Sequence, residues 1–404
     1  MIVHKAYRLE LDPNNVQRSS LNRAAGARRF AFNWALERVG KRELKPNQFV
    51  LINAWNQWKH EGAPWWNENS KFCYEEAFED VTRAFQNFFR DPAKFKYPKF
   101  ARKNVNDRCR FRSVQVEGRY LQLPKIGCIR YKNKPLELPP GIKLLDATVR
   151  RVADRWEVSI VAEQNIPDPG PIIGPIVGID LGLTTFATVG AQSGEVERYQ
   201  APKPLKRALR KLRRCHRQLS RSVKESNRRK RRILRVAKCH RRVFNIRNDF
   251  LHKTTSQLAR TKTALVVEDL GVANMIRNPK LSRCIADVSW GAFLNMLDYK
   301  TRWYGSELQR VDRFYPSSQT CSGCGHRQPM QLSQRVYACP QCGAIMDRDD
   351  NAAVGLARCY TGSRQHQEFI PPGRGKFTAE ESLEHQGDSA NRQVNAPQVA
   401  TLNF

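Results

Sequence analysis

Residues 317–353 constrain the fold of this 404-residue chain more than any other stretch of its sequence. They contain two Cys-x-x-Cys pairs with 14 residues between them. The four cysteines are Cys321, Cys324, Cys339 and Cys342. Two turns that each offer two thiolates have the ligand spacing of a zinc ribbon, in which the tetrahedral ion is structural. A redox motif would need only one pair, and His326 is not needed as a substitute ligand because four thiolates already complete the shell.

A run of acids follows the cysteines directly. Asp347, Asp349 and Asp350 stand before Asn351 and two alanines. Because a four-thiolate zinc shell leaves no open position, any catalysis here has to use carboxylates instead of the zinc. Asp347 has the position of a helix N-cap, with Asp350 three residues later as its capping-box partner. Asp349 is therefore the acid best placed to bind a catalytic metal.

The charge of the chain indicates its partners. The sequence has 70 Lys and Arg against 38 Asp and Glu, a formal net charge of +32. An excess of this size attracts polyanions, and phosphate neutralisation releases counterions, so we expect a nucleic-acid partner. No apolar run approaches the roughly 20 residues of a membrane span, and the first residues lack a signal-peptide core. The scattered spacing of the other cysteines favours reduced thiols, and thus an intracellular protein.

The first 170 residues combine short strands with a block of helices. Residues 2–12 alternate like a strand, and three helices are expected at 15–42, 46–61 and 71–89. Short alternating runs follow at 98–100, 110–116, 120–123, 126–131, 144–152 and 156–163. Turn residues between them predict an antiparallel barrel or sandwich that the first strand joins. The segments 1–14 and 96–170 would then form one β domain, with 15–95 as a helical insertion.

The second half reads as an α/β domain after a linker at 166–175. Apolar runs at 176–180 and 264–267 are typical of buried strands, and each run leads to a carboxylate, Asp180 or Glu268. Two further strands are expected at 185–189 and 195–199, and a helix at 287–309. Between them, residues 203–258 predict a basic helical hairpin that breaks at 226–227. His216 takes one apolar position in the apolar stripe of its first helix. The other members of the stripe are Leu205, Leu209, Leu212, Leu219 and Val223. A short helix fades near residue 360, and 361–404 read as a disordered tail.

Three carboxylates from distant positions suit a site for two divalent ions. Asp180, Glu268 and Asp349 would hold Mg²⁺, activate a water and stabilise the leaving oxygen of a phosphodiester. Residues 177–185 also begin like the phosphate loop of actin-like and heat-shock-type ATPases. Those ATPases and nucleases with such a carboxylate site share a ribonuclease H-like core, so the two groups can begin alike. That interpretation needs a second glycine-rich phosphate loop, which residues 269–273 do not supply, and it leaves the ribbon and the charge unexplained.

Several motifs together resemble one known family. They are GIDLG at 178–182, EDLGVANM at 268–275, SSQTCSGCG at 317–325, CPQCG at 339–343 and DRDDNAA at 347–353, with NWALE at 33–37, NFFR at 87–90 and YPKF at 97–100. They are similar to the motifs of the TnpB (OrfB) family, transposon-encoded RNA-guided nucleases related to type V CRISPR effectors. The resemblance covers most of the chain to about residue 360.

The resemblance implies the following domains and roles. Residues 171–313 and 346–360 would form a RuvC-like nuclease domain with Asp180, Glu268 and Asp349 as catalytic acids, interrupted by the zinc ribbon at 314–345. The β domain would be a wedge barrel that grips guide RNA, and 15–95 a recognition insertion. Lys71 is a candidate contact to the short motif that flanks the DNA target. The rest of the target sequence would be read by pairing with the guide RNA.

The expected function is therefore RNA-guided cleavage of double-stranded DNA, with a single RuvC-like site for both strands and one chain per guide RNA. The expected location is the prokaryotic cytoplasm, at the nucleoid. The alternatives are a compact type V CRISPR effector, a guided DNA-binding regulator without cleavage and, from another class, a basic structural RNA-binding protein.

Overall fold

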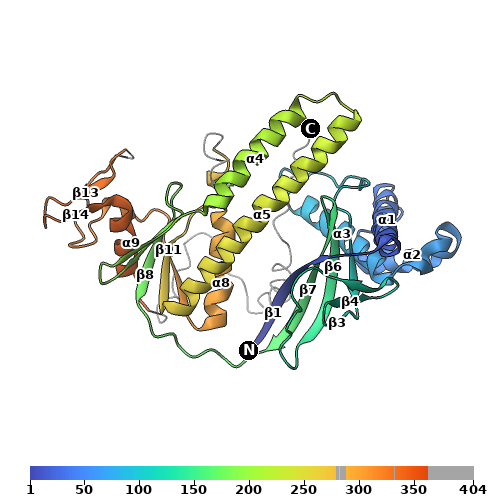
Figure 1. Cartoon of the computed structure of the whole chain (residues 1–404), viewed down its shortest axis with the longest axis horizontal. Coiled ribbons are helices and arrows are strands. Elements are labelled where there is room, and N and C mark those ends of the chain that lie inside the picture. Colours follow the sequence, from blue (N-terminus) through green and yellow to red (C-terminus); the bar gives the residue numbers. More distant parts are fainter. Residues whose placement is uncertain (279–281, 283–287, 332, 363–404) are drawn as a thin grey trace. The chain divides into compact units, whose positions relative to one another are not determined.

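The computed structural model describes residues 1–278, 282, 288–331 and 333–362, and it divides at residues 166 and 167 into two compact units (Figure 1). The first unit is Met1–Ile166 and the second begins at Pro167. The tail predicted at 361–404 lies outside the described residues from 363 onward.

The first unit contains two antiparallel sheets that share one hydrophobic core. The larger sheet has the order β1-β7-β6-β2, and the smaller has the order β3-β4-β5. Their strands are β1 (Ile2–Leu11), β2 (Arg108–Arg112), β3 (Gln115–Glu117), β4 (Tyr120–Leu123), β5 (Gly127–Arg130), β6 (Lys143–Val152) and β7 (Arg155–Asn165). The prediction that the first strand joins this sheet is confirmed, because β1 pairs with β7 along its whole length. Closure into a barrel stays a prediction.

Two strand predictions in this unit are wrong. The run predicted at 110–116 is divided between β2 and β3, which belong to different sheets, because the chain turns at Ser113, whose φ is 57°. Residues 98–100 have no regular secondary structure. Pro98 has no amide hydrogen to donate to a sheet, and the segment crosses the surface as an irregular connection.

The three predicted helices of the first unit are confirmed. They are α1 (Asn15–Gly40), α2 (Gln48–Gly62) and α3 (Lys71–Arg90), with the 3₁₀ helix η1 (Pro64–Glu68) before α3. Asn14 caps α1 through a capping box with Gln17. An aromatic core that includes Trp34, Trp55 and Phe78 holds the helices together.

The second unit contains a five-stranded mixed sheet of order β10-β9-β8-β11-β12. Its strands are β8 (Ile176–Asp180), β9 (Ala187–Ala191), β10 (Val196–Tyr199), β11 (Ala264–Glu268) and β12 (Glu307–Val311). The strands β8, β11 and β12 run parallel, and β9 and β10 are antiparallel to their neighbours. Val177 and Ile179 share a core with Leu251 and Leu258 of α5 (Asn227–Thr261) and with α8 (Trp290–Tyr304). This core covers one face of the sheet.

The helix predicted at 287–309 extends too far. In the structure α8 ends at Tyr304, where Gly305 adopts a left-handed φ of 83° and terminates the helix. The residues beyond it form the edge strand β12, parallel to β11. A short helix α6 (Val272–Met275) follows β11.

The basic hairpin is formed by α4 (Lys203–Ser220) and α5, as expected (Figure 1). The predicted break is confirmed, since the Ser226 side chain accepts the amide hydrogen of Arg229 and caps α5. The predicted apolar stripe is only partly correct. Val223 is 78% exposed, and the residue that enters the interface near His216 is Cys215, whose Sγ lies 3.6 Å from that of Cys239.

Candidate active site

The carboxyl ends of β8 and β11 bring two predicted acids to the same edge of the sheet. Ile179 pairs with Val267 in the parallel register, so Asp180 and Glu268 follow at equivalent positions. Side chains alternate along a strand, and Ile179 and Val267 face the core with α5 and α8. Asp180 and Glu268 therefore point to the opposite face of the sheet.

The helix α9 (Arg348–Arg358) packs on this opposite face because two paired glycines let it approach the strands. A Cβ built on Gly178 would lie 2.1 Å from the Ala353 carbonyl oxygen, and one on Gly190 would lie 2.6 Å from the Val354 nitrogen. Only glycine fits at such distances. Gly178 is two residues before Asp180, and Ala353 is four residues after Asp349, so the glycine contact sets the first turn of α9 beside the acidic strand ends.

The acids at the start of α9 have different partners. Asp347 is the N-cap, as predicted, and accepts the amide hydrogens of Asp349 and Asp350. The capping-box prediction for Asp350 is wrong, since Arg198 of β10 donates two hydrogen bonds to its carboxylate at 2.6 and 3.2 Å. Asp349 contacts only the neighbouring Arg348 guanidinium, at 3.2 Å, among the partners described for it.

The electrostatics of Asp180 reflect this arrangement. Burial, together with the negative charges of Glu268 and Asp349, raises the pKa of Asp180 to about 7, and Arg348 offsets part of this rise. The Ser317 hydroxyl donates a hydrogen bond to Glu268. The structure thus brings Glu268 and Asp349 close enough to Asp180 to influence its ionisation.

The oxygens of these three acids are spaced more widely than the ligands of one tight metal site. Among the described residues, only the cysteine group has all its ligand atoms within 4.8 Å of one another. Carboxylate oxygens are the donors that Mg²⁺ prefers, so the chemistry of this donor set fits a hard divalent ion.

The four cysteines converge as the sequence predicts. The Sγ atoms of Cys321 and Cys342 lie 3.7 Å apart, and those of Cys324 and Cys339 lie 3.5 Å apart. Zinc–sulfur bonds of about 2.3 Å place tetrahedral sulfurs roughly 3.8 Å apart. The spacing of the sulfurs therefore fits one zinc ion.

Each cysteine pair sits in the same kind of turn. Cys321 accepts the amide hydrogen of Gly325 at its carbonyl, and Cys339 does the same for Gly343, both at 3.0 Å. The two glycines have φ values of 79° and 73°, which explains the glycine directly after each pair. The strands β13 (Val336–Ala338) and β14 (Ile345–Asp347) complete the ribbon.

The sequence interpretation missed Asn351. This side chain is fully buried, accepts the amide hydrogen of Ser322 at 2.8 Å and donates to the Thr320 carbonyl at 2.7 Å. A polar residue among alanines in the first two turns of a buried helix was the available signal, because buried amides need partners.

A hollow of about 370 Å³ lies between the segment after β11 and the start of α8, and none of the three acids lines it. Arg310 and Arg313 line it together with Asn274 and Asn295. Arg313 donates a hydrogen bond of 2.8 Å to Asp269, the residue after Glu268.

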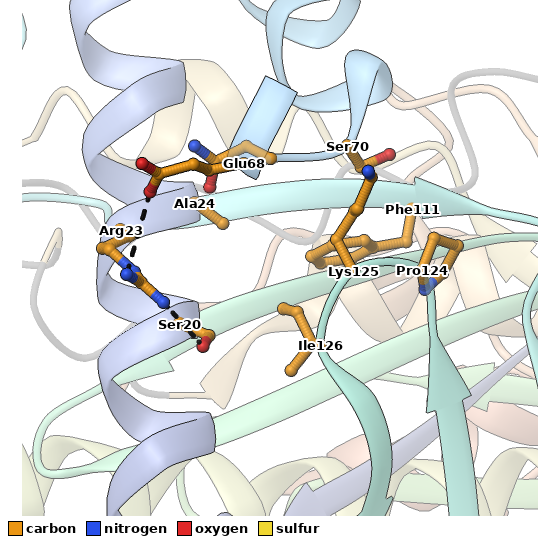
Figure 2. Close-up of a pocket in the computed structure, with 10 residues that line it drawn as sticks. Ser20, Arg23, Ala24, Glu68, Ser70, Phe111, Pro124, Lys125 and Ile126 are labelled. Atoms are coloured by element: carbon orange, nitrogen blue, oxygen red, sulfur yellow. Dashed lines mark hydrogen bonds and ion pairs between the residues drawn. The ribbon is translucent and has the colours of Figure 1, made fainter. Parts of the chain in front are cut away.

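Lys71, the predicted flanking-motif contact, is an exposed residue at the start of α3 in the first unit. The adjacent Ser70 lines a pocket with Arg23, Lys125 and Ile126 (Figure 2). This pocket has a volume of about 20 Å³, which admits a water molecule but no base. A role for Lys71 stays a prediction.

The fold and the two sites define a mixed α/β protein with a four-cysteine, zinc-ribbon-like site next to a cluster of acids. A family model described as a probable transposase, OrfB of IS605, matches residues 159–279, and a Cas12f1-like TNB domain matches residues 290–356. A helix-turn-helix model of the same OrfB family matches residues 1–42, where the structure has one strand and one continuous helix.

Curated relatives cover nearly the whole chain. A Streptomyces pristinaespiralis protein named "Putative RNA-guided DNA endonuclease" is 34% identical over 94% of this chain and 96% of its own length. A Mycobacterium tuberculosis protein with the same description is 35% identical over 88% of this chain and 86% of its own. Escherichia coli InsQ is 30% identical over 92% of this chain and 96% of its own length. This chain belongs to the TnpB (OrfB) family.

A solved Cas12f1–sgRNA–target DNA complex aligns with 88% of this chain and 99% of its own, at 14% identity and a TM-score of 0.36, which is too low to establish a shared fold. No helix among the described residues is long and apolar enough to cross a membrane.

Proposed function

We propose that this chain is a transposon-encoded, RNA-guided DNA endonuclease that hydrolyses phosphodiester bonds beside a short flanking motif. The observation that carries the proposal is the carboxylate cluster of Asp180, Glu268 and Asp349, with the pKa of Asp180 raised to about 7 by burial and by the other two acids. A buried carboxylate that two further acids repel destabilises a fold unless cations neutralise the site. The names of the relatives favour the same activity.

The three acids would hold two Mg²⁺ ions. When bound, the ions supply the charge that activates a water and stabilises the leaving oxygen of the phosphodiester. Ser317 orients Glu268, and the Asp347 cap together with the packing of α9 on Gly178 orients Asp349. Arg310 and Arg313 both pair with Asp269, the residue after Glu268, and together they leave one net positive charge for nearby phosphates.

The remaining parts of the chain take supporting roles. We assign 171–313 and 346–360 to a RuvC-like nuclease domain, 314–345 to the zinc ribbon, 1–14 and 96–170 to a wedge barrel that holds guide RNA, and 15–95 to the recognition insertion. The strand order with three parallel and two antiparallel strands supports the nuclease assignment. The basic hairpin 203–258 tracks phosphates, because most of its Lys and Arg side chains are exposed and it has one acid between 203 and 247. We further propose that one chain binds each guide RNA and acts at the nucleoid.

The test replaces Asp180 by alanine in the full chain purified with its native RNA. We expect guided cleavage of a plasmid that carries the matching target to fall at least about a hundredfold, with RNA binding unchanged. Asp350→Ala is the matched control, since its carboxylate pairs with Arg198 and it should keep most of the activity. Unchanged cleavage by Asp180→Ala would refute the site.

Sequencing the co-purified RNA separates the alternatives. A dedicated RNA from a transposon end supports the proposal, and an RNA from a CRISPR array indicates a compact type V effector. Specific target binding without cleavage by the wild-type protein indicates a guided regulator. Recovery of heterogeneous cellular RNA would favour a structural RNA-binding protein.

A further inference from the structure

The segment 94–103, with the sequence KFKYPKFARK, alternates cationic and aromatic residues on the surface of the first unit. It contains five Lys and Arg residues and three aromatic residues, and the stretch between Asp91 and Asp107 has no acid. Its backbone is irregular, with no helix or strand. Phe100 and the cations of this segment are exposed, and none of the hydrophobic cores of the described residues includes Phe100.

The backbone of this segment is anchored on both sides of Phe100. The Tyr97 ring packs edge-on against Phe85 and Phe88 of α3, at centroid distances of 5.4 and 5.5 Å. The Asn33 side chain of α1 binds both polar groups of Ala101, accepting from its nitrogen at 2.7 Å and donating to its oxygen at 3.1 Å. The segment is therefore a fixed surface feature and not a loose loop.

Between these anchors, the Phe100 side chain is 58% exposed. Lys99 and Arg102 beside it are exposed as well. A single exposed aromatic residue is ordinary, and Phe49 of α2, 75% exposed, is an example with only Lys45 as a charged residue within five positions. Phe100 differs because a fixed backbone holds it among cations.

The chemistry of the segment selects its partner. An apolar protein surface would bury the cations of the segment without partners, which is costly. A nucleic-acid duplex offers phosphates but keeps its base faces stacked inside. Unpaired nucleotides offer both a base face for an aromatic ring and a phosphate for a cation. RNA recognition uses such unpaired bases, stacked on aromatic side chains.

We propose that the segment 94–103 is a stacking platform for unpaired nucleotides of the guide RNA. Phe100 stacks on one base, and Lys99 and Arg102 contact the phosphates on either side. The inference rests on the proposed function, because that function supplies an RNA that stays bound before and during target recognition.

The experiment uses the full chain and three probes of about 12 nucleotides or base pairs: an unstructured RNA, its DNA counterpart and a blunt RNA duplex. Fluorescence anisotropy over a series of salt concentrations gives the affinity and its salt dependence. Phe100→Ala should weaken binding of the unstructured RNA about 5- to 100-fold at an unchanged salt slope, while Phe100→Trp restores it. Lys99→Gln should lower the salt slope by about 0.7. Phe49→Ala is the matched control and should change nothing.

Ultraviolet cross-linking of the chain with its co-purified RNA gives an independent measurement. We expect nucleotide adducts on the peptide with residues 94–103 and none on the peptide with Phe49. Wild-type affinity of Phe100→Ala, or absence of the adduct, would overturn the platform. A loss confined to the DNA probe would overturn it in favour of a DNA strand. If the platform is overturned but guided cleavage persists, the proposed function stands. If the wild-type protein never cleaves, the RNA-binding and cross-linking results still show whether residues 94–103 bind unpaired nucleotides.

Discussion

Replacing Asp180 by asparagine should stabilise the protein in buffer without added divalent ions. The pKa of this carboxyl is about 7 in the fold against an ordinary value of 3.8. A folded-state pKa above the unfolded one means that the folded state keeps a proton that the unfolded chain loses. The stability that Asp180 contributes is therefore full below about pH 4 and is lost as the pH rises to about 7.

The size of the effect follows from these two pKa values. At about 1.4 kcal/mol for each pH unit between them, the ionised carboxylate costs the fold at most about 4 kcal/mol at pH 8. Asp180 is partly exposed, and solvent screening reduces this to about 2 kcal/mol. For a unit of this size, the melting temperature of the Asp180→Asn variant should exceed that of the wild type by about 4–8 °C.

Thermal unfolding of both proteins at pH 4.5 and pH 8 measures this difference. The gap should be small at pH 4.5 and full at pH 8, and Mg²⁺ at pH 8 should raise the melting temperature of the wild type more than that of the variant. The matched control is Asp350→Asn, which breaks the ion pair with Arg198 and should melt slightly lower than the wild type. A gap of equal size at both pH values, or a variant that melts below the wild type at pH 8, would refute the reasoning.

Three further predictions concern packing, zinc and the buried lysine. Gly178→Ala should cost about 3 kcal/mol and abolish cleavage, because its Cβ would lie 2.1 Å from the Ala353 oxygen; denaturant unfolding and a cleavage assay measure both effects. Cys339→Ser should lose about one equivalent of zinc, measured by atomic emission, and lower the melting temperature. Burial lowers the pKa of Lys300 to about 8, so its folded form loses the proton more readily than the unfolded chain does. The free energy of unfolding of the wild type, relative to that of Lys300→Met, should therefore rise by about 1 kcal/mol between pH 8 and pH 10. Urea unfolding at the two pH values measures this rise.

The parts of the site that the sequence predicts are those with a local signal. The spacing of the four cysteines needs no knowledge of distant contacts, and neither does the apolar run that leads to Asp180. Asp347 was recognisable as an N-cap because capping depends on residues two and three positions away.

The parts that the sequence does not predict depend on distant partners. Asp350 has the spacing of a capping box, yet its carboxylate accepts hydrogen bonds from Arg198 of the distant strand β10. Gly178 looks like an ordinary strand glycine until a helix about 175 residues later packs against it. Residues 307–311 lack the apolar character of a central strand, since β12 is an edge strand, and this favoured the wrong assignment to helix.

The position of the ribbon next to α9 gives its zinc site an effect on the acids. Ser322 lies between two of the cysteines, and its amide hydrogen bonds to Asn351, which is two residues after Asp349 on the same helix. Ser317, four residues before the first cysteine, bonds to Glu268. The segment that the metal orders therefore touches the positions of two of the three acids. A zinc ion bound by the four cysteines would take no part in the proposed hydrolysis and would still position its acids, because a buried asparagine with two hydrogen bonds ties the first turn of α9 to the cysteine turn.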